Sequence, residues 1–104
     1  MTITEYSKLI ERTNPYDNRE AIVYNWLKDI IRISTKMNYK DALEKVCNIL
    51  DNYGSVKTGK IDGRPVAYLI IDAPVAIKEQ IRNIKFHVED QQERDFSEKI
   101  LNIR

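Results

Sequence analysis

The chain has 104 residues, of which 42% are hydrophobic and 32% are charged, and this length predicts one domain spanning residues 1–104. Seventeen Lys and Arg residues against sixteen Asp and Glu residues give a formal net charge of +1 at pH 7. This balance argues against a global field that would hold the chain on a phosphate backbone or an anionic membrane.

Cysteine and histidine usage bounds the chemistry further. Cys47 is the single cysteine and His87 the single histidine, so the chain has no intramolecular disulfide and too few of these ligands for a zinc site. The first residues lack the pattern of a signal peptide, and no window approaches the length of a membrane span. We therefore expect a cytoplasmic protein with no cofactor, no metal and no membrane association.

Three helices are predicted before Gly54, over residues 3–12, 18–37 and 39–53. Each begins with a short polar residue followed three positions later by an acid, the pattern of a capping box. These pairs are Thr2 with Glu5, Asp17 with Glu20, and Asn38 with Asp41. Gly54 is expected to end the third helix in a left-handed conformation.

The second helix carries the widest apolar stripe of the chain. Its members recur at spacings of four, four, three and four, and they predict a central helix: Ile22, Trp26, Ile30, Ile33 and Met37. Val23, Leu27 and Ile31 broaden this stripe.

A β-hairpin is predicted from residue 56 to residue 71. Asp62-Gly63 lies between two β-prone runs and favours a type I′ turn. Gly59 suggests a bulge, and Lys57 and Lys60 are typical of a protected edge strand. Both faces of the second strand, 66–71, are apolar, so both are expected to be covered.

After the hairpin, Asp72 is expected to cap a helix that tolerates Pro74 in its first turn and ends near Asn83. Alternation of Ile84, Phe86 and Val88 with polar residues then predicts a short strand over 84–88, with a continued helix as the open alternative. Asp90 and Glu93 restart a last helix, expected to bury Phe96, Ile100 and Ile103. The predicted fold class is α+β: three N-terminal helices packed with a small hairpin-based sheet and two C-terminal helices.

Positive charge is concentrated in the middle of the chain. Residues 55–88 hold six Lys or Arg against three acids, and the candidate nucleic-acid or anion-binding residues are Lys57, Lys60, Arg64, Arg82 and Lys85. Lysines on an edge strand also serve solubility, which is the commoner reason for such a pattern.

Catalytic patterns are weak. Asp72 follows an apolar strand, where general bases occur, but a capping role fits it better. A nucleophilic pair of Cys47 and His87 would need an orienting third group, and Cys47 fits an apolar helical face. We therefore expect no catalytic residues and no enzymatic activity.

Tyrosine is abundant, with six residues, and amphipathic tyrosines are enriched at interfaces. Tyr24, Tyr53 and Tyr68 fall on apolar faces and are expected in or near the core. The candidate partner-binding residues are Tyr6, Tyr16, Tyr39 and Phe86.

These observations favour a small non-enzymatic protein that binds a macromolecular partner, here interpreted as a phage or mobile-element inhibitor of a host protein. Fifteen Ile, ten Lys and eight Asn against five Ala fit the AT-rich coding typical of such sources. Two alternatives stay open: a nucleic-acid-binding regulator that uses the basic hairpin, and a protein that sequesters a small anionic ligand. We also expect a homodimer, formed at the free edge of strand 66–71 or on the surface of Ile77, Ile81 and Phe86.

Overall fold

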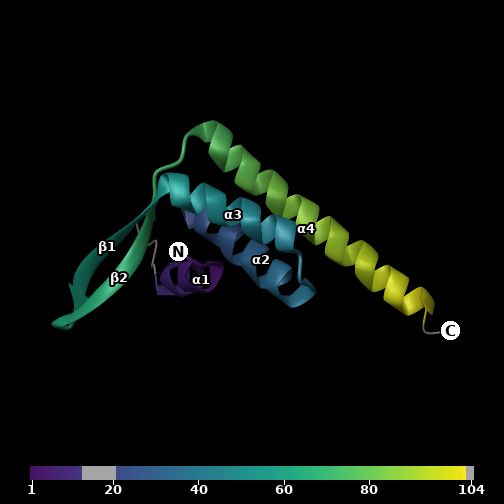
Figure 1. Cartoon of the computed structure of the whole chain (residues 1–104), viewed down its shortest axis with the longest axis horizontal. Helices are drawn as coiled ribbons and strands as arrows, with labels where there is room; N and C mark the ends of the chain where they lie inside the picture. Colours follow the sequence, from purple (N-terminus) through teal and green to yellow (C-terminus); the bar gives the residue numbers. More distant parts are fainter. Residues whose placement is uncertain (13–20, 103–104) are drawn as a thin grey trace.

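The computed structural model describes residues 1–12 and 21–102, with side-chain positions for all of these except residues 61 and 99–102. It is an α+β structure, as the sequence predicts. A two-stranded antiparallel sheet follows three helices and precedes one long helix (Figure 1). The elements are α1 (Ile3–Arg12), α2 (Ala21–Met37), α3 (Lys40–Tyr53), β1 (Gly54–Ile61), β2 (Arg64–Ile71) and α4 (Val75–Asn102).

The first helix begins as its capping box predicts. The Glu5 N–H donates to Thr2 Oγ1 at 3.2 Å, and the Thr2 N–H donates back to Glu5 Oε1 at 3.5 Å. The second predicted capping pair, Asp17 with Glu20, lies outside the described residues.

The central position of α2 is confirmed, but its buried arc is rotated from the predicted stripe. Leu27 and Ser34 lie near the middle of this arc and are fully buried, whereas Ile22 is 54% exposed and Trp26 is half-buried. The residues expected only to broaden the stripe face the core, because α2 is covered by α1 and α3 and also by α4. A helix face that contacts three other helices is wider than the single stripe formed by residues spaced four and three apart.

Asn38 ends α2 rather than starting α3, which corrects the third capping prediction. Its φ of 59° is left-handed, and the Tyr39 N–H donates to the Ser34 carbonyl oxygen at 2.8 Å. This six-to-one bond is typical of a Schellman C-terminus, in which asparagine tolerates the left-handed position. The N-cap of α3 is therefore Tyr39, whose side chain makes no capping bond.

Gly54 is needed for close approach and not for a left-handed cap. Its backbone is extended, with φ −98° and ψ 147°, and α3 passes into β1 with no intervening loop. A Cβ at this position would lie 2.7 Å from the Leu50 carbonyl oxygen, so any side chain would require the backbone to move.

The predicted hairpin and its turn are confirmed. Asp62 and Gly63 have φ of 52° and 78°, as a type I′ turn requires, and Ile61 pairs directly with Arg64. Pairing continues without interruption to Gly54 and Ile71, so the predicted bulge at Gly59 is absent. The Tyr68 ring lies against Gly59 instead, with Cε1 3.4 Å from the place of a Cβ.

Only one face of β2 is covered by the helices, which corrects the expectation for strand 66–71. Leu69 and Ile71 point into the core, while Ile70 on the opposite face is 36% exposed. The end of the hairpin that carries the turn projects beyond the helices (Figure 1).

A single helix, α4, replaces the two predicted C-terminal helices and the predicted strand at 84–88. Ile81 and Val88 are buried in the core and Ile84 is partly buried, so these residues form one helical seam. Phe86 falls outside that seam and is 49% exposed, as its helical angle requires. The apparent alternation was therefore produced by an exposed phenylalanine.

The ends of α4 also differ from expectation. The Pro74 carbonyl accepts the Ile77 and Lys78 N–H groups, each at 3.0 Å, so the helix begins at Val75 without a capping bond from Asp72. Phe96 is 40% exposed rather than buried. The side chain of Ile100 and the whole of Ile103 lie outside the described residues.

At roughly 1.5 Å per residue, the 28 residues of α4 are about 42 Å long against about 26 Å for α2. The C-terminal part of α4 accordingly extends past the other helices (Figure 1). Within the described residues, no helix combines the length and the apolar character needed to span a membrane.

Candidate functional site

Two surfaces qualify as candidate sites: the projecting part of the hairpin, and a groove between α3 and α4. They differ in what holds them in place. The hairpin is anchored at its base by core contacts and by one tyrosine hydroxyl, whereas the groove is lined by residues from the start of α3 and the middle of α4.

Tyr24, on α2, fixes the base of the hairpin. Its hydroxyl donates to the Leu69 carbonyl oxygen at 2.7 Å and accepts the Ile71 N–H at 3.3 Å, and all three residues are buried. A hydroxyl has one hydrogen to donate and lone pairs to accept, so this geometry uses both abilities. The backbone of β2 is therefore bonded to the helical core as well as to β1.

This contact occupies the edge at which the predicted homodimer would pair. Leu69 and Ile71 direct their backbone groups away from β1, and Tyr24 is bonded to both. Pro65, near the start of β2, has no N–H to donate. A second copy would have to displace buried hydrogen bonds to add a strand here, so the edge of β2 offers poor support for the dimer.

The projecting part of the hairpin carries three exposed cations. Lys57, Lys60 and Arg64 form no ion pair with any described residue, and Asp62 at the turn is the one acid of the hairpin. Val56, 46% exposed, lies beside them on β1. Arginine and exposed apolar side chains are enriched at protein interfaces, and exposed lysines beside them can steer an acidic partner to this surface.

The remaining basic candidates are elsewhere. Arg82 and Lys85 flank the exposed Phe86 ring on α4, with their cationic groups 5.4 and 5.2 Å from its centroid. Lys85 Nζ also lies 2.5 Å from Glu89 Oε1. The turn of the hairpin points away from α4 (Figure 1), so Arg64 does not join Arg82 and Lys85 in one anion pocket.

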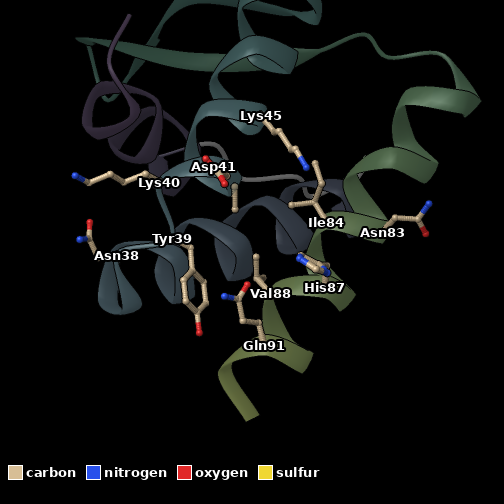
Figure 2. Close-up of a pocket in the computed structure, with 11 residues that line it drawn as sticks. Asn38, Tyr39, Lys40, Asp41, Lys45, Asn83, Ile84, His87, Val88 and Gln91 are labelled. Carbon is tan, nitrogen blue, oxygen red and sulfur yellow. The ribbon is translucent and has the colours of Figure 1, made fainter. Parts of the chain in front are cut away.

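The groove has a volume of about 690 Å³ and opens between the start of α3 and the middle of α4 (Figure 2). Lys45 points across it toward Ile84, while Lys40 and Asn38 point away from α4. The full lining comprises Asn38, Tyr39, Lys40, Asp41, Ala42, Lys45, Asn83, Ile84, His87, Val88 and Gln91. The polar lining includes two lysines, one aspartate, one histidine and three amides, so its charge does not select one kind of ligand.

The candidate tyrosines are largely committed to intramolecular bonds. Tyr6 is buried and its hydroxyl bonds to Asp51, which leaves it little surface for a partner. Tyr39 is half-buried and bonds to Asp95 on α4; burial first, and then this bond, raise the pKa of its hydroxyl to about 12. Tyr16 lies outside the described residues, and of the other three only Phe86 is openly exposed.

The catalytic candidates are not brought together. The Cys47 thiol donates to the Met1 carbonyl oxygen at 3.6 Å, while His87 lines the groove. Burial, followed by the charge of Asp51, raises the pKa of the Cys47 thiol, which disfavours a nucleophilic thiolate. Within the described residues, no group of three His, Cys, Asp or Glu side chains is placed to hold a metal ion.

Sequence reasoning missed Tyr24 as the residue that closes the edge of β2, and Lys45 as part of the groove. A tyrosine on the apolar face of a central helix does signal that its hydroxyl needs a partner. The partner itself is 45 residues away along the chain and leaves no local pattern. Comparisons with protein-family models, curated proteins and solved structures found no match to this chain.

Proposed function

We propose that this chain is a non-enzymatic protein that binds a macromolecular partner through its hairpin, from Val56 to Ile70. The observation that supports this most directly is the combination of exposed Val56 and Ile70 near the base with three cations that form no ion pair with any described residue, on an element whose turn end projects beyond the helices. A two-stranded hairpin is marginally stable by itself, so the projection gains little folding free energy.

In this proposal the partner is a protein, and the bound hairpin covers part of its surface, as an inhibitor would. A nucleic acid is the second candidate, favoured by the exposure of Lys57, Lys60 and Arg64 on a narrow two-stranded ribbon. Three phosphate contacts give weak binding that falls steeply with salt, because each released counterion adds to the salt dependence.

Affinity capture from a lysate of cells that produce the protein tests the proposal. The hairpin variant is Lys57→Glu with Arg64→Glu. The matched control is Lys8→Glu with Arg12→Glu, which makes the same charge change on an exposed lysine and an exposed arginine of α1. We expect a captured protein that survives nuclease treatment, is lost with the hairpin variant and is retained with the control.

Equal capture by both variants would show that the hairpin is not the contact surface. A partner that disappears after nuclease treatment, together with salt-sensitive retention of the chain on a polyanion column, would favour the nucleic acid instead.

A further inference from the structure

The two outer edges of the sheet differ in what occupies them. On β2, the backbone groups of Leu69 and Ile71 are bonded to Tyr24, and Pro65 removes another donor. No described residue is hydrogen-bonded to the outer edge of β1. Among the described residues, the edge of β2 is therefore closed at its base, whereas the edge of β1 is available.

The register identifies the groups on the available edge. The Asp72 N–H donates to the Tyr53 carbonyl oxygen at 2.9 Å, so these two residues form a hydrogen-bonded pair. The register is unbroken from this pair to the turn. Because backbone groups alternate in direction along a strand, Val56, Thr58 and Lys60 direct their N–H and C=O groups away from β2. Within the described residues, these groups have no hydrogen-bond partner, and all three side chains are exposed.

The chemistry of this edge favours a polypeptide over a nucleic acid. It presents donors and acceptors in alternation, three of each, which an extended peptide strand matches with its own alternating acceptors and donors. A phosphate backbone offers acceptors, so it would leave the carbonyl groups of the edge unmatched.

Charge indicates which polypeptide fits. Lys57 and Lys60 project from opposite faces of β1, and Arg64 lies at the turn, so a strand laid along this edge has cations beside it on both faces. A second copy of the chain would bring the same cations into contact, and like charges across paired strands are destabilising. An acidic segment would be attracted, and the same lysines that disfavour self-pairing would select it.

We propose that the outer edge of β1, at Val56, Thr58 and Lys60, binds an extended acidic segment of a partner protein as a third strand. This inference rests on the proposed function, since it names the kind of partner segment and the backbone groups that receive it.

The test uses the full chain and a fluorescein-labelled synthetic peptide of alternating glutamate and valine, with binding followed by fluorescence anisotropy. Thr58→Pro removes an N–H that faces away from β2, and Thr58→Val is the matched control that keeps this N–H. We expect Thr58→Pro to weaken peptide binding at least about fivefold, and Thr58→Val to leave it within about twofold. A peptide of alternating lysine and valine should not bind.

Backbone NMR on the unmodified chain gives a second measurement that does not depend on how Thr58→Pro folds. On addition of the glutamate peptide, the amide signals of Val56, Thr58 and Lys60 should shift, while those of Leu69 and Ile71 should not. Shifts confined to residues outside the β1 edge would overturn the proposal.

The remaining outcomes separate this proposal from the proposed function. If the glutamate peptide fails to bind at 1 mM, or binds Thr58→Pro and Thr58→Val equally, strand addition is wrong even where capture still depends on the hairpin. If an oligothymidylate probe binds and the peptide does not, the basic ribbon contacts nucleic acid. If capture is insensitive to the hairpin variant while the peptide binds as expected, the edge is a peptide site and the proposed function is wrong.

Discussion

The base and the turn end of the hairpin belong to the same two strands but are held by different forces. At the base, Leu69 and Ile71 are buried and their backbone groups are bonded to Tyr24. At the turn end, Lys57, Lys60 and Arg64 are exposed and depend on the ladder between the strands and on the turn itself. Regular strand pairing therefore does not by itself show where a hairpin contributes to stability. Here the buried side chains, and the backbone groups that are hydrogen-bonded to a helix, are concentrated at one end of the hairpin.

The largest expected effect is at the base, with Leu69→Ala. Leu69 is fully buried on β2, which packs against α1, so truncation should lower the free energy of unfolding by about 2–5 kcal/mol, measured by urea denaturation. Ile70→Ala on the opposite face is the matched control and should cost less than about 1 kcal/mol. Equal losses would mean that both faces of β2 are covered.

The next effect concerns the hydroxyl that joins α2 to β2. Tyr24→Phe keeps the ring but leaves the Leu69 carbonyl and the Ile71 N–H without their shared partner. We expect a loss of about 1–3 kcal/mol in the same denaturation experiment, because buried backbone groups then lack a hydrogen bond. Tyr68→Phe, a half-buried tyrosine on the far face, should change stability by less than about 0.5 kcal/mol.

A smaller effect is expected at the turn, with Gly63→Ala. Alanine is strained at the observed φ of 78°, so the free energy of unfolding should fall by about 1 kcal/mol. Asp62→Asn is the matched change, since asparagine accepts the left-handed conformation, and it should be neutral within about 0.5 kcal/mol. A loss at Gly63 as large as at Leu69 would contradict the difference between the two ends.

The smallest effect should come from Val56→Thr on β1, a half-exposed residue opposite Leu69. Threonine keeps the β-branched shape, and the side chain is already partly in water, so thermal denaturation should show a change within about 0.5 kcal/mol. A loss above about 1 kcal/mol would indicate that Val56 is packed against the helices and that the hairpin projects less than described.

The features that the sequence predicted well are those determined by near neighbours. Asp62-Gly63 specifies its turn because the two residues tolerate positive φ, and Thr2 with Glu5 specifies a helix start within four residues. The apolar period of α2 correctly indicated a central helix, although it placed Ile22 and Trp26 on the buried stripe, and the structure has Ile22 54% exposed and Trp26 half-buried.

The errors arose where the deciding contact is distant in sequence. Ile84, Phe86 and Val88 alternate as a strand would, and the packing of Ile81 and Val88 in the core decided for a helix. Asn38 is the exception, because its deciding contact is local: it fits both a helix start and a helix end, and the backbone bond from Tyr39 to Ser34 decided for the end. The cations of the candidate site were identified from the sequence, but the open edge of β1 was not, because it follows from the way Tyr24 closes the other edge.

The bond between Tyr24 and the Ile71 N–H has a consequence for hydrogen exchange. That amide cannot exchange with solvent through fraying of the hairpin alone, since the Tyr24 hydroxyl that protects it belongs to α2. Its exchange should therefore require the base of the hairpin to separate from α2, and its protection should approach that of the α2 core amides. The outward amides of Val56, Thr58 and Lys60 should exchange within the dead time of the experiment. One short strand pair would then contain both the slowest and the fastest class of amides in the molecule.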